Sequence, residues 1–233
     1  MKNNFLLVCF LLISTHSLFG QSEEVQRKSY VTFDVLSPIA SYSPAWKVGY
    51  FRKINDQFII GAEVGIGTYG TSINFVGDGD WIENDYFKFE VSPELIYVLN
   101  PNHTFENFVS AEAFYIRHTD SFENSSYRSE TNSQYFNYDS ADYRRQKFGL
   151  NLNYGAIINF SKRFGLIPKV GFGVRVRSVD FSNIVNPELD PNNQGEDGGL
   201  VESVAPNIRD FLEIEGSVTR LNFNFDIKLF YKF

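Results

Sequence analysis

The chain ends in the stretch LNFNFDIKLFYKF, residues 221–233, and this segment decides the fold. Apolar side chains occupy every second position: Leu221, Phe223, Phe225, Ile227, Leu229, Tyr231 and Phe233. The positions between them carry polar or charged side chains, interrupted once by Phe230. Successive side chains of a β-strand point to opposite faces, so the alternation predicts a strand with one apolar and one charged face.

Seven segments upstream show the same alternation, and with the C-terminal one they make eight. They cover residues 30–37, 46–52, 58–68, 87–99, about 109–115, 147–158 and 166–177. A strand that crosses a bilayer at a tilt needs about 9 to 11 residues. The sequence therefore predicts an all-β fold, an eight-stranded antiparallel up-and-down transmembrane β-barrel.

The connections between these segments alternate in length. Short turns are expected at 54–57, 100–103 and 161–163, and long polar connections at 69–85, about 119–143 and about 182–217. The first connection, 38–44, is short but lies on the side of the long ones. Outer-membrane barrels have short periplasmic turns and long external loops. The pattern predicts an outer-membrane protein of a Gram-negative bacterium with both termini in the periplasm.

The first twenty residues are typical of a secretory signal peptide, because Lys2 precedes an apolar run from Phe5 to Ile13, and small or polar residues follow as far as Gly20. We therefore expect two parts, a signal peptide at 1–20 and a barrel domain at 21–233. The only cysteine, Cys9, lies in the signal peptide, so disulfides and cysteine-ligated metals are not expected in the mature chain. A net charge of −7 and a pI near 5.0 argue against nucleic acid as a partner.

Alternation alone leaves open which face is inside, and a soluble lipocalin-like barrel with an apolar interior is the alternative. The polar face carries glycines and charges of both signs, which suits a narrow lumen whose buried charges pair with one another. The predicted lumen charge network consists of Asp34, Lys47, Glu63, Lys88, Glu90, Glu94, Glu112, Lys147, Lys169, Arg175, Arg177, Arg220, Asp226 and Lys228. Aromatic residues near strand ends, Phe181 among them, are expected to form interfacial girdles.

The ending IKLFYKF, with a terminal Phe after alternating apolar residues, resembles the assembly signal of outer-membrane β-barrel proteins. With the signal peptide and the hairpin plan, the mature chain resembles the small OmpA/OmpX-like barrel superfamily. The resemblance implies contact with outer-membrane lipids and recognition by the barrel-assembly machinery through Leu229, Tyr231 and Phe233. The superfamily hosts unlike activities, so it leaves the function open.

No catalytic, cofactor or metal site is predicted. His118, followed by Asp120, Ser121 and Glu123, is the best hydrolytic candidate, but neighbours in sequence do not make a triad. His103 is expected in a periplasmic turn. Residues 190–197 partly match a calcium loop, yet Val201 stands where the loop needs a bidentate Glu. A flexible acidic loop is the preferred interpretation.

The predicted function is a structural or surface-interaction role of the adhesion type, without enzymatic activity. An extracellular ligand would bind the long outer connections, where alternation in the second long connection suggests that the fifth and sixth strands extend above the membrane. This region offers tyrosine side chains for contact, including Tyr127, Tyr135, Tyr138 and Tyr143. Two alternatives remain: a narrow pore for ions or small solutes, and a lipid-modifying outer-membrane enzyme.

Overall fold

The computed structural model describes residues 28–39, 43–71, 82–83, 85–130, 134–190 and 213–233. The predicted signal peptide lies outside these residues. The long strands are β1 (Ser29–Asp34), β2 (Trp46–Lys53), β3 (Phe58–Thr68), β4 (Phe87–Val98), β5 (Phe105–Arg128), β6 (Tyr135–Asn159), β7 (Phe164–Val185) and β9 (Gly216–Lys232). Two short 3-10 turns, η2 (Ser37–Ile39) and η3 (Tyr69–Thr71), and the two-residue β8 (Glu188–Leu189) complete the elements. No helix in the described part of the chain is long and apolar enough to cross a bilayer.

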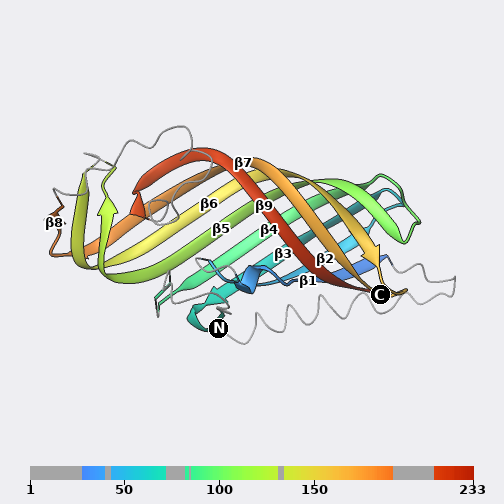
Figure 1. The fold of residues 1–233 in the computed structure, drawn as a ribbon, viewed down its shortest axis with the longest axis horizontal. Coiled ribbons are helices and arrows are strands. Elements are labelled where there is room, and N and C mark those ends of the chain that lie inside the picture. Colours follow the sequence, from blue (N-terminus) through green and yellow to red (C-terminus); the bar gives the residue numbers. More distant parts are fainter. Residues whose placement is uncertain (1–27, 40–42, 72–81, 84, 131–133, 191–212) are drawn as a thin grey trace, which may run out of the picture.

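The eight long strands form a closed antiparallel ring in the order β1-β2-β3-β4-β5-β6-β7-β9, as Figure 1 shows. The ring closes where β1 pairs with β9, from Tyr30 opposite Lys232 to Asp34 opposite Lys228. Each strand otherwise pairs with its neighbours in sequence, and β8 adds a short pairing at the end of β6. The predicted eight-stranded up-and-down barrel is confirmed.

The strands differ greatly in length, and the fifth and sixth strands extend into the second long connection, as the alternation there suggested. β1 has 6 residues, whereas β5, β6 and β7 have 24, 25 and 22. The expected loop at 119–143 is mostly strand, because β5 continues to Arg128 and β6 begins at Tyr135. Both faces of these extensions contain polar residues, so the alternation of hydrophobicity that marks a strand is weak there.

The outer surface of the ring carries an apolar belt. The large hydrophobic side chains exposed on it include Val31, Phe33, Trp46, Val48, Tyr50, Phe58, Ile60, Val64, Ile66, Phe89, Leu95, Val109, Phe148, Leu150, Leu152, Tyr154, Val170, Phe172, Val174, Leu221, Phe223 and Phe225. Along β5 the belt ends at Tyr115, and along β6 it ends at Phe148, beyond which Arg144 is exposed. The prediction that the apolar face lies outside is confirmed. Phe181 is an exception, because it is only 7% exposed and packs inward.

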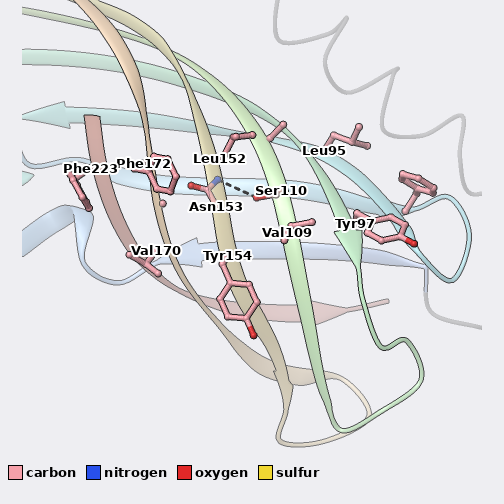
Figure 2. Close-up of a pocket in the computed structure, with 13 residues that line it drawn as sticks. Leu95, Tyr97, Val109, Ser110, Leu152, Asn153, Tyr154, Val170, Phe172 and Phe223 are labelled. Carbon is pink, nitrogen blue, oxygen red and sulfur yellow. Dashed lines mark hydrogen bonds between the residues drawn. The ribbon is translucent and has the colours of Figure 1, made fainter. Parts of the chain in front are cut away.

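The belt is hollowed where small side chains replace large ones. Ala111 of β5 lies opposite Leu95 on β4 and Leu152 on β6. These small side chains leave a groove of about 620 Å³ in the belt. Figure 2 shows side chains from β4, β5, β6, β7 and β9 along it. The lining is almost entirely apolar, including Tyr97, Tyr154 and Phe172. Acyl chains would fill such a groove without loss of hydrogen bonds.

An apolar cluster fills the lumen at the end where the short turns lie. It consists of Tyr30, Phe51, Ile59, Ile96, Val98, Phe108, Ile157, Ile167 and Phe230. Phe230, which interrupts the polar face of the C-terminal segment, is thus an interior residue. The sequence predicted a polar lumen throughout, and this end of it is apolar instead. The pattern does not reveal the cluster, because each strand contributes only one or two of its residues and no apolar run marks them.

Glycines on neighbouring strands make room for the rings of this cluster. Phe51 lies opposite Gly61, Phe108 opposite Gly155 and Phe230 opposite Gly165. A Cβ added to Gly155 would lie 2.5 Å from Cζ of Phe108. The rings therefore cover the glycines, and any larger residue there would collide with a buried side chain.

Candidate functional site

A layer of ion pairs lies in the lumen next to the apolar cluster. The Lys228 ammonium is 2.5 Å from a carboxylate oxygen of Glu63. Lys169 contacts three carboxylates, Glu94 at 3.0 Å, Asp226 at 3.4 Å, and Glu112. Ionic groups in a low-dielectric interior are costly unless they are paired, so these contacts hold the inner faces of β3, β4, β5, β7 and β9 together.

A second set of pairs continues the layer toward β1 and β2. Lys47 lies 3.1 Å from Glu90 and 3.6 Å from Asp34, and Lys88 lies 2.9 Å from Glu90. Side-chain amides complete the layer, since Asn151 donates to Glu112 at 3.1 Å. The hydroxyl of Ser110 likewise donates to Glu94 at 2.6 Å. The layer is a packed polar plug.

Basic side chains form a further layer on the side of the long strands. Lys147 lies opposite Arg177 across β6 and β7, and Arg175 lies opposite Arg220 across β7 and β9. Arg175 donates to Asn222 at 3.1 Å, and Arg177 donates to the carbonyl of Ile214 at 3.2 Å. The charged residues named from the sequence thus separate into a mixed ion-pair layer and this basic layer, a division that the alternation pattern does not reveal.

His118 does not meet the partners that a hydrolytic site requires. Its ring is fully buried, with edge contacts to Tyr86 and Tyr143 at centroid distances of 4.8 and 5.2 Å. Nε2 lies 3.7 Å from Asp120, which also faces inward. Ser121 lies opposite the exposed Asp142 of β6, on the other face of the sheet. The sequence candidate therefore has no nucleophile at hydrogen-bond distance among the described residues.

Asp120 is held by the backbone around it. Its carboxylate accepts N–H groups from Glu83 and from Ser121, both at 3.0 Å. Burial nevertheless raises the pKa of Asp120 to about 6, because desolvation disfavours the charged form. His103 is exposed in the β4–β5 turn, where its carbonyl accepts from Asn159, at the end of the barrel opposite His118.

Beyond the belt, β5, β6 and β7 continue as a projecting structure that we call the outer sheet, residues 117–128, 135–146 and 178–185. In Figure 1 these strands reach far past the ends of β1 to β4. An aromatic cluster holds its inner face together: Tyr127, Tyr138, Ala141, Tyr143, Val179 and Phe181, with Phe122, Phe136 and Ile184 packed against it. The Phe181 ring lies 5.1 Å from Tyr127 and 5.3 Å from Tyr143.

The tyrosines expected as contact residues for a ligand are therefore packing residues. Tyr127, Tyr135, Tyr138 and Tyr143 are all buried. Burial raises the pKa of Tyr138 to about 12. The sequence prediction of a tyrosine-rich contact surface is wrong, because alternation turns these side chains inward.

Polar side chains cover the outer face of this sheet instead. Arg144 on β6 makes a 2.8 Å ion pair with Asp180 on β7. Asn183 donates to Asp142 at 2.7 Å, and Asn186 donates to Asp139 at 2.6 Å. These cross-strand contacts place amides, carboxylates and guanidinium groups on the outer face.

The segment before β9 ties the outer sheet to the rest of the barrel. Ile214 forms a parallel bridge with Arg128, and the Glu215 N–H donates to the Arg128 carbonyl at 3.0 Å. Gly216 then adopts a φ of 95°, and a Cβ there would meet the Glu130 side chain. Only glycine takes this left-handed backbone at little cost.

The acidic segment with the partial calcium pattern lies outside the described residues apart from Asp190. Within the described ranges, no group of three or more His, Cys, Asp or Glu side chains is arranged to hold a metal ion. Leu229 and Phe233 are exposed at the end of β9. Tyr231 stacks on Phe233 there, with centroids 6.4 Å apart.

No protein-family model matches the sequence, and no curated protein matches it either. Among solved structures, the chain is similar to the crystal structure of Acinetobacter baumannii CarO. The two share 11% sequence identity and a TM-score of 0.40, over 91% of this chain and 100% of that one. Membership of the OmpA/OmpX-like superfamily stays a prediction.

Proposed function

We propose that the protein is an outer-membrane β-barrel that presents the outer sheet at the cell surface for a structural or adhesive interaction. The observation that carries this proposal is the continuation of β5, β6 and β7 beyond the apolar belt, with a core of their own and a polar outer face. A belt of exposed aliphatic and aromatic side chains around a charged lumen fits a bilayer and would be costly in water. Lipids are the partners that this belt supports.

In this proposal the long strands point outward from the cell and the short turns face the periplasm. The β9 strand, with Leu229, Tyr231 and Phe233 at its end, is the element that the assembly machinery would recognise. The polar outer face, with Asp142 and Arg144, is the surface offered to a partner. Hydrogen-bonding groups on a rigid sheet give specificity at low entropic cost.

The orientation can be tested by cysteine labelling, since the predicted mature chain has no cysteine. Single variants Asp142→Cys in the outer sheet and Lys162→Cys in the β6–β7 turn are expressed in a Gram-negative host. We expect a membrane-impermeant maleimide to label the first on intact cells and the second only after lysis. The opposite pattern, or recovery of the protein in the soluble periplasmic fraction, would reject the proposal.

The surface role has a separate test. Cells expressing the protein are compared, for adherence to solid supports and to each other, with cells expressing the Asp142→Ala/Arg144→Ala variant. We expect the variant to lose the gain in adherence. The matched control is Lys53→Ala, which removes a polar surface contact to Asp56 near the short turns. Equal adherence of expressing and non-expressing cells would remove the adhesive role and leave a structural one.

We also propose that the protein is not an enzyme and not an open pore. The burial of His118 and the outward orientation of Ser121 argue against lipid hydrolysis. The apolar cluster and the ion-pair layer argue against a conducting lumen. Unchanged lipid A mass spectra between expressing and non-expressing cells are the expected result for the first point.

A further inference from the structure

Strand β5 forms the floor of the groove in the apolar belt, and Val109 and Ala111 line the groove. Four successive outward side chains of this strand are small or of medium size: Asn107, Val109, Ala111 and Ala113. The aromatic rings of Phe105 and Tyr115 end the stretch on either side. We call this stretch of the belt, residues 107–113 with the side chains that border it, the β5 channel.

Large side chains on the two neighbouring strands form the walls of the β5 channel. Just as Ala111 lies between two leucines, Val109 lies between Tyr97 on β4 and Tyr154 on β6 in one row of paired residues. Figure 2 shows the two tyrosine rings on either side of Val109. The channel is therefore bounded on both sides and follows the direction of the strand.

The length of the β5 channel fits one leaflet of a bilayer. From Asn107 to Ala113 the strand rises by about 20 Å. Strands of membrane barrels are tilted by about 45°, so the channel covers about 14 Å of depth, close to half of a hydrocarbon core that is about 30 Å thick. An extended acyl chain with its head group at the membrane surface covers the same depth.

Hydrogen-bonding groups stand at the end of the channel that lies next to the short turns. The Tyr154 hydroxyl donates to Oδ1 of Asn107 at 3.0 Å, and the Tyr97 hydroxyl accepts from Nε2 of Gln57 at 3.0 Å. Within the described part of the chain, the amide hydrogens of Asn107 and the hydroxyl hydrogen of Tyr97 have no acceptor. These hydrogens can donate to ester or phosphate oxygens, as tyrosine and asparagine do where a belt meets water.

An amphiphile with a flexible chain suits this arrangement better than a second barrel does. Large exposed side chains cover the rest of the belt, and two convex surfaces of this kind meet along a line without filling a channel. An acyl chain can follow the channel and gain dispersion contacts with the floor and both walls. Its polar end then lies at the free donors, so that no hydrogen-bonding group is placed in the hydrocarbon layer.

We propose that the β5 channel binds one acyl chain of a glycerophospholipid, whose ester and phosphate oxygens accept hydrogen bonds from Tyr97 and Asn107. Tyr154 acts as a positioning residue, because its hydrogen bond to Oδ1 turns the amide hydrogens of Asn107 toward the lipid. The inference rests on the proposed membrane location and adds a specific lipid site to it. The site is separate from the outer sheet that carries the proposed surface role.

The test uses the full mature chain, refolded in a lipid-free non-ionic detergent and checked by heat-modifiable gel mobility. Dioleoylphosphatidylethanolamine is titrated into the micelles, and bound lipids are counted by native mass spectrometry. We expect one lipid to bind and saturate before further lipids add. Ala111→Phe should weaken this binding by about tenfold or more, because the ring fills the channel and excludes the chain from its contacts.

Ala62→Phe is the matched control, because Ala62 also faces outward, on β3, but lies outside the groove. It should bind the lipid as the unmodified protein does. Asn107→Leu and Tyr97→Phe keep the channel apolar and remove the donors at its end. Each should weaken binding by about two- to tenfold, as expected for the loss of one hydrogen bond.

Three outcomes would overturn the proposal. The first is the absence of a saturable lipid, or equal binding by Ala111→Phe and Ala62→Phe. The second is unchanged binding by both Asn107→Leu and Tyr97→Phe, because the head group would then lie elsewhere. The third is a lipid-free dimer that Ala111→Phe dissociates, which would assign the groove to a second copy of the chain.

The titration in detergent does not depend on cysteine labelling of intact cells or on adherence. Failure of lipid binding with the expected labelling pattern would therefore reject the lipid site alone. Recovery of the protein in the soluble periplasmic fraction would instead reject the proposed function.

Discussion

Position 155 requires a glycine because the Phe108 ring of the neighbouring strand β5 lies against it. Phe108 is fully buried beneath it, and any side chain at 155 would occupy the space of that ring. We expect Gly155→Val to lower the free energy of unfolding by about 1 to 3 kcal/mol through overpacking, or more if the ring is expelled. Urea unfolding in lipid vesicles measures the effect.

The control for this substitution is Gly70→Ala, because nothing lies within 4 Å of the added Cβ there. Its effect should stay within about 0.5 kcal/mol, as for most surface substitutions. If Gly155→Val unfolds at the same urea concentration as Gly70→Ala, the cluster is loose and the ring does not need the glycine.

Lys169 is the counterion of three carboxylates at once. Lys169→Met would leave Glu94, Glu112 and Asp226 buried with less compensation. Removing one partner from a buried ion pair costs about 3 to 5 kcal/mol, so the variant should fold poorly at neutral pH. Folding yield, measured by heat-modifiable mobility, should recover in part when Glu112→Gln is added.

Lys53→Met is the comparison for Lys169→Met. Lys53 pairs with the largely exposed Asp56 at 3.3 Å, and such pairs contribute about 0 to 1 kcal/mol. Similar folding yields for the two lysine variants would mean that the lumen is hydrated enough to screen the carboxylates.

Asp120 gives the stability a dependence on pH. Its pKa of about 6 lies above the unfolded value of about 3.9, so between these values the folded state holds a proton that the unfolded state has lost. The stabilising contribution of this group is therefore complete below about pH 4 and is lost as the pH rises through about 6.

The substitution Asp120→Asn removes that dependence. We expect the variant to be more stable than the unmodified protein at pH 8 and to lose this advantage near pH 4, which urea unfolding at both pH values will show. Parallel pH profiles of the two proteins would mean that Asp120 titrates normally.

Among the elements, β5 and β6 show where the alternation of apolar and polar residues stops being a clear strand signal. Between Phe105 and Tyr115 the outward residues are mainly apolar and the inward ones mainly polar, so alternation is visible. Past Arg117 the outward residues become polar, while His118 and Asp120 face inward. A strand with polar residues on both faces resembles a loop in sequence, so the alternation there only suggested an extension, and the pairing with β6 and the aromatic cluster establish its length.

The outer sheet should open without the barrel. Phe181 contacts three tyrosines of the aromatic cluster, and Phe181→Ala removes a buried ring at a cost of about 3 to 5 kcal/mol. We expect hydrogen exchange to become faster in residues 120–128 and 136–145 and to stay unchanged in β3. Phe148→Ala, on the exposed belt, is the control. Faster exchange throughout the barrel would show that the two parts unfold as one.

For the whole molecule, the sequence predicted the ring, its strand number and which face is outside. These follow from alternation and from the distribution of charge. The contents of the lumen were less predictable, because the apolar cluster draws only one or two residues, such as Tyr30, Ile96 and Phe230, from each of the eight long strands. The separation of the ion-pair layer from the basic layer also depends on register, which a single chain pattern does not contain.

The apolar cluster and the ion-pair layer lie one after the other along the lumen. This arrangement predicts that the barrel does not conduct ions. An ion would have to cross a cluster of nine buried apolar residues and then the lysine–carboxylate layer. An eight-stranded ring leaves an interior that side chains just fill, so there is no continuous path for water. We expect no steady conductance in planar bilayers from the unmodified protein or from Phe108→Ala/Phe230→Ala, because the ion-pair layer remains closed in that variant. Adding Glu94→Gln and Lys169→Gln should weaken the second barrier and give measurable currents, provided that heat-modifiable mobility shows a folded barrel. Steady conductance of the unmodified protein would contradict the closed lumen and favour the narrow-pore alternative.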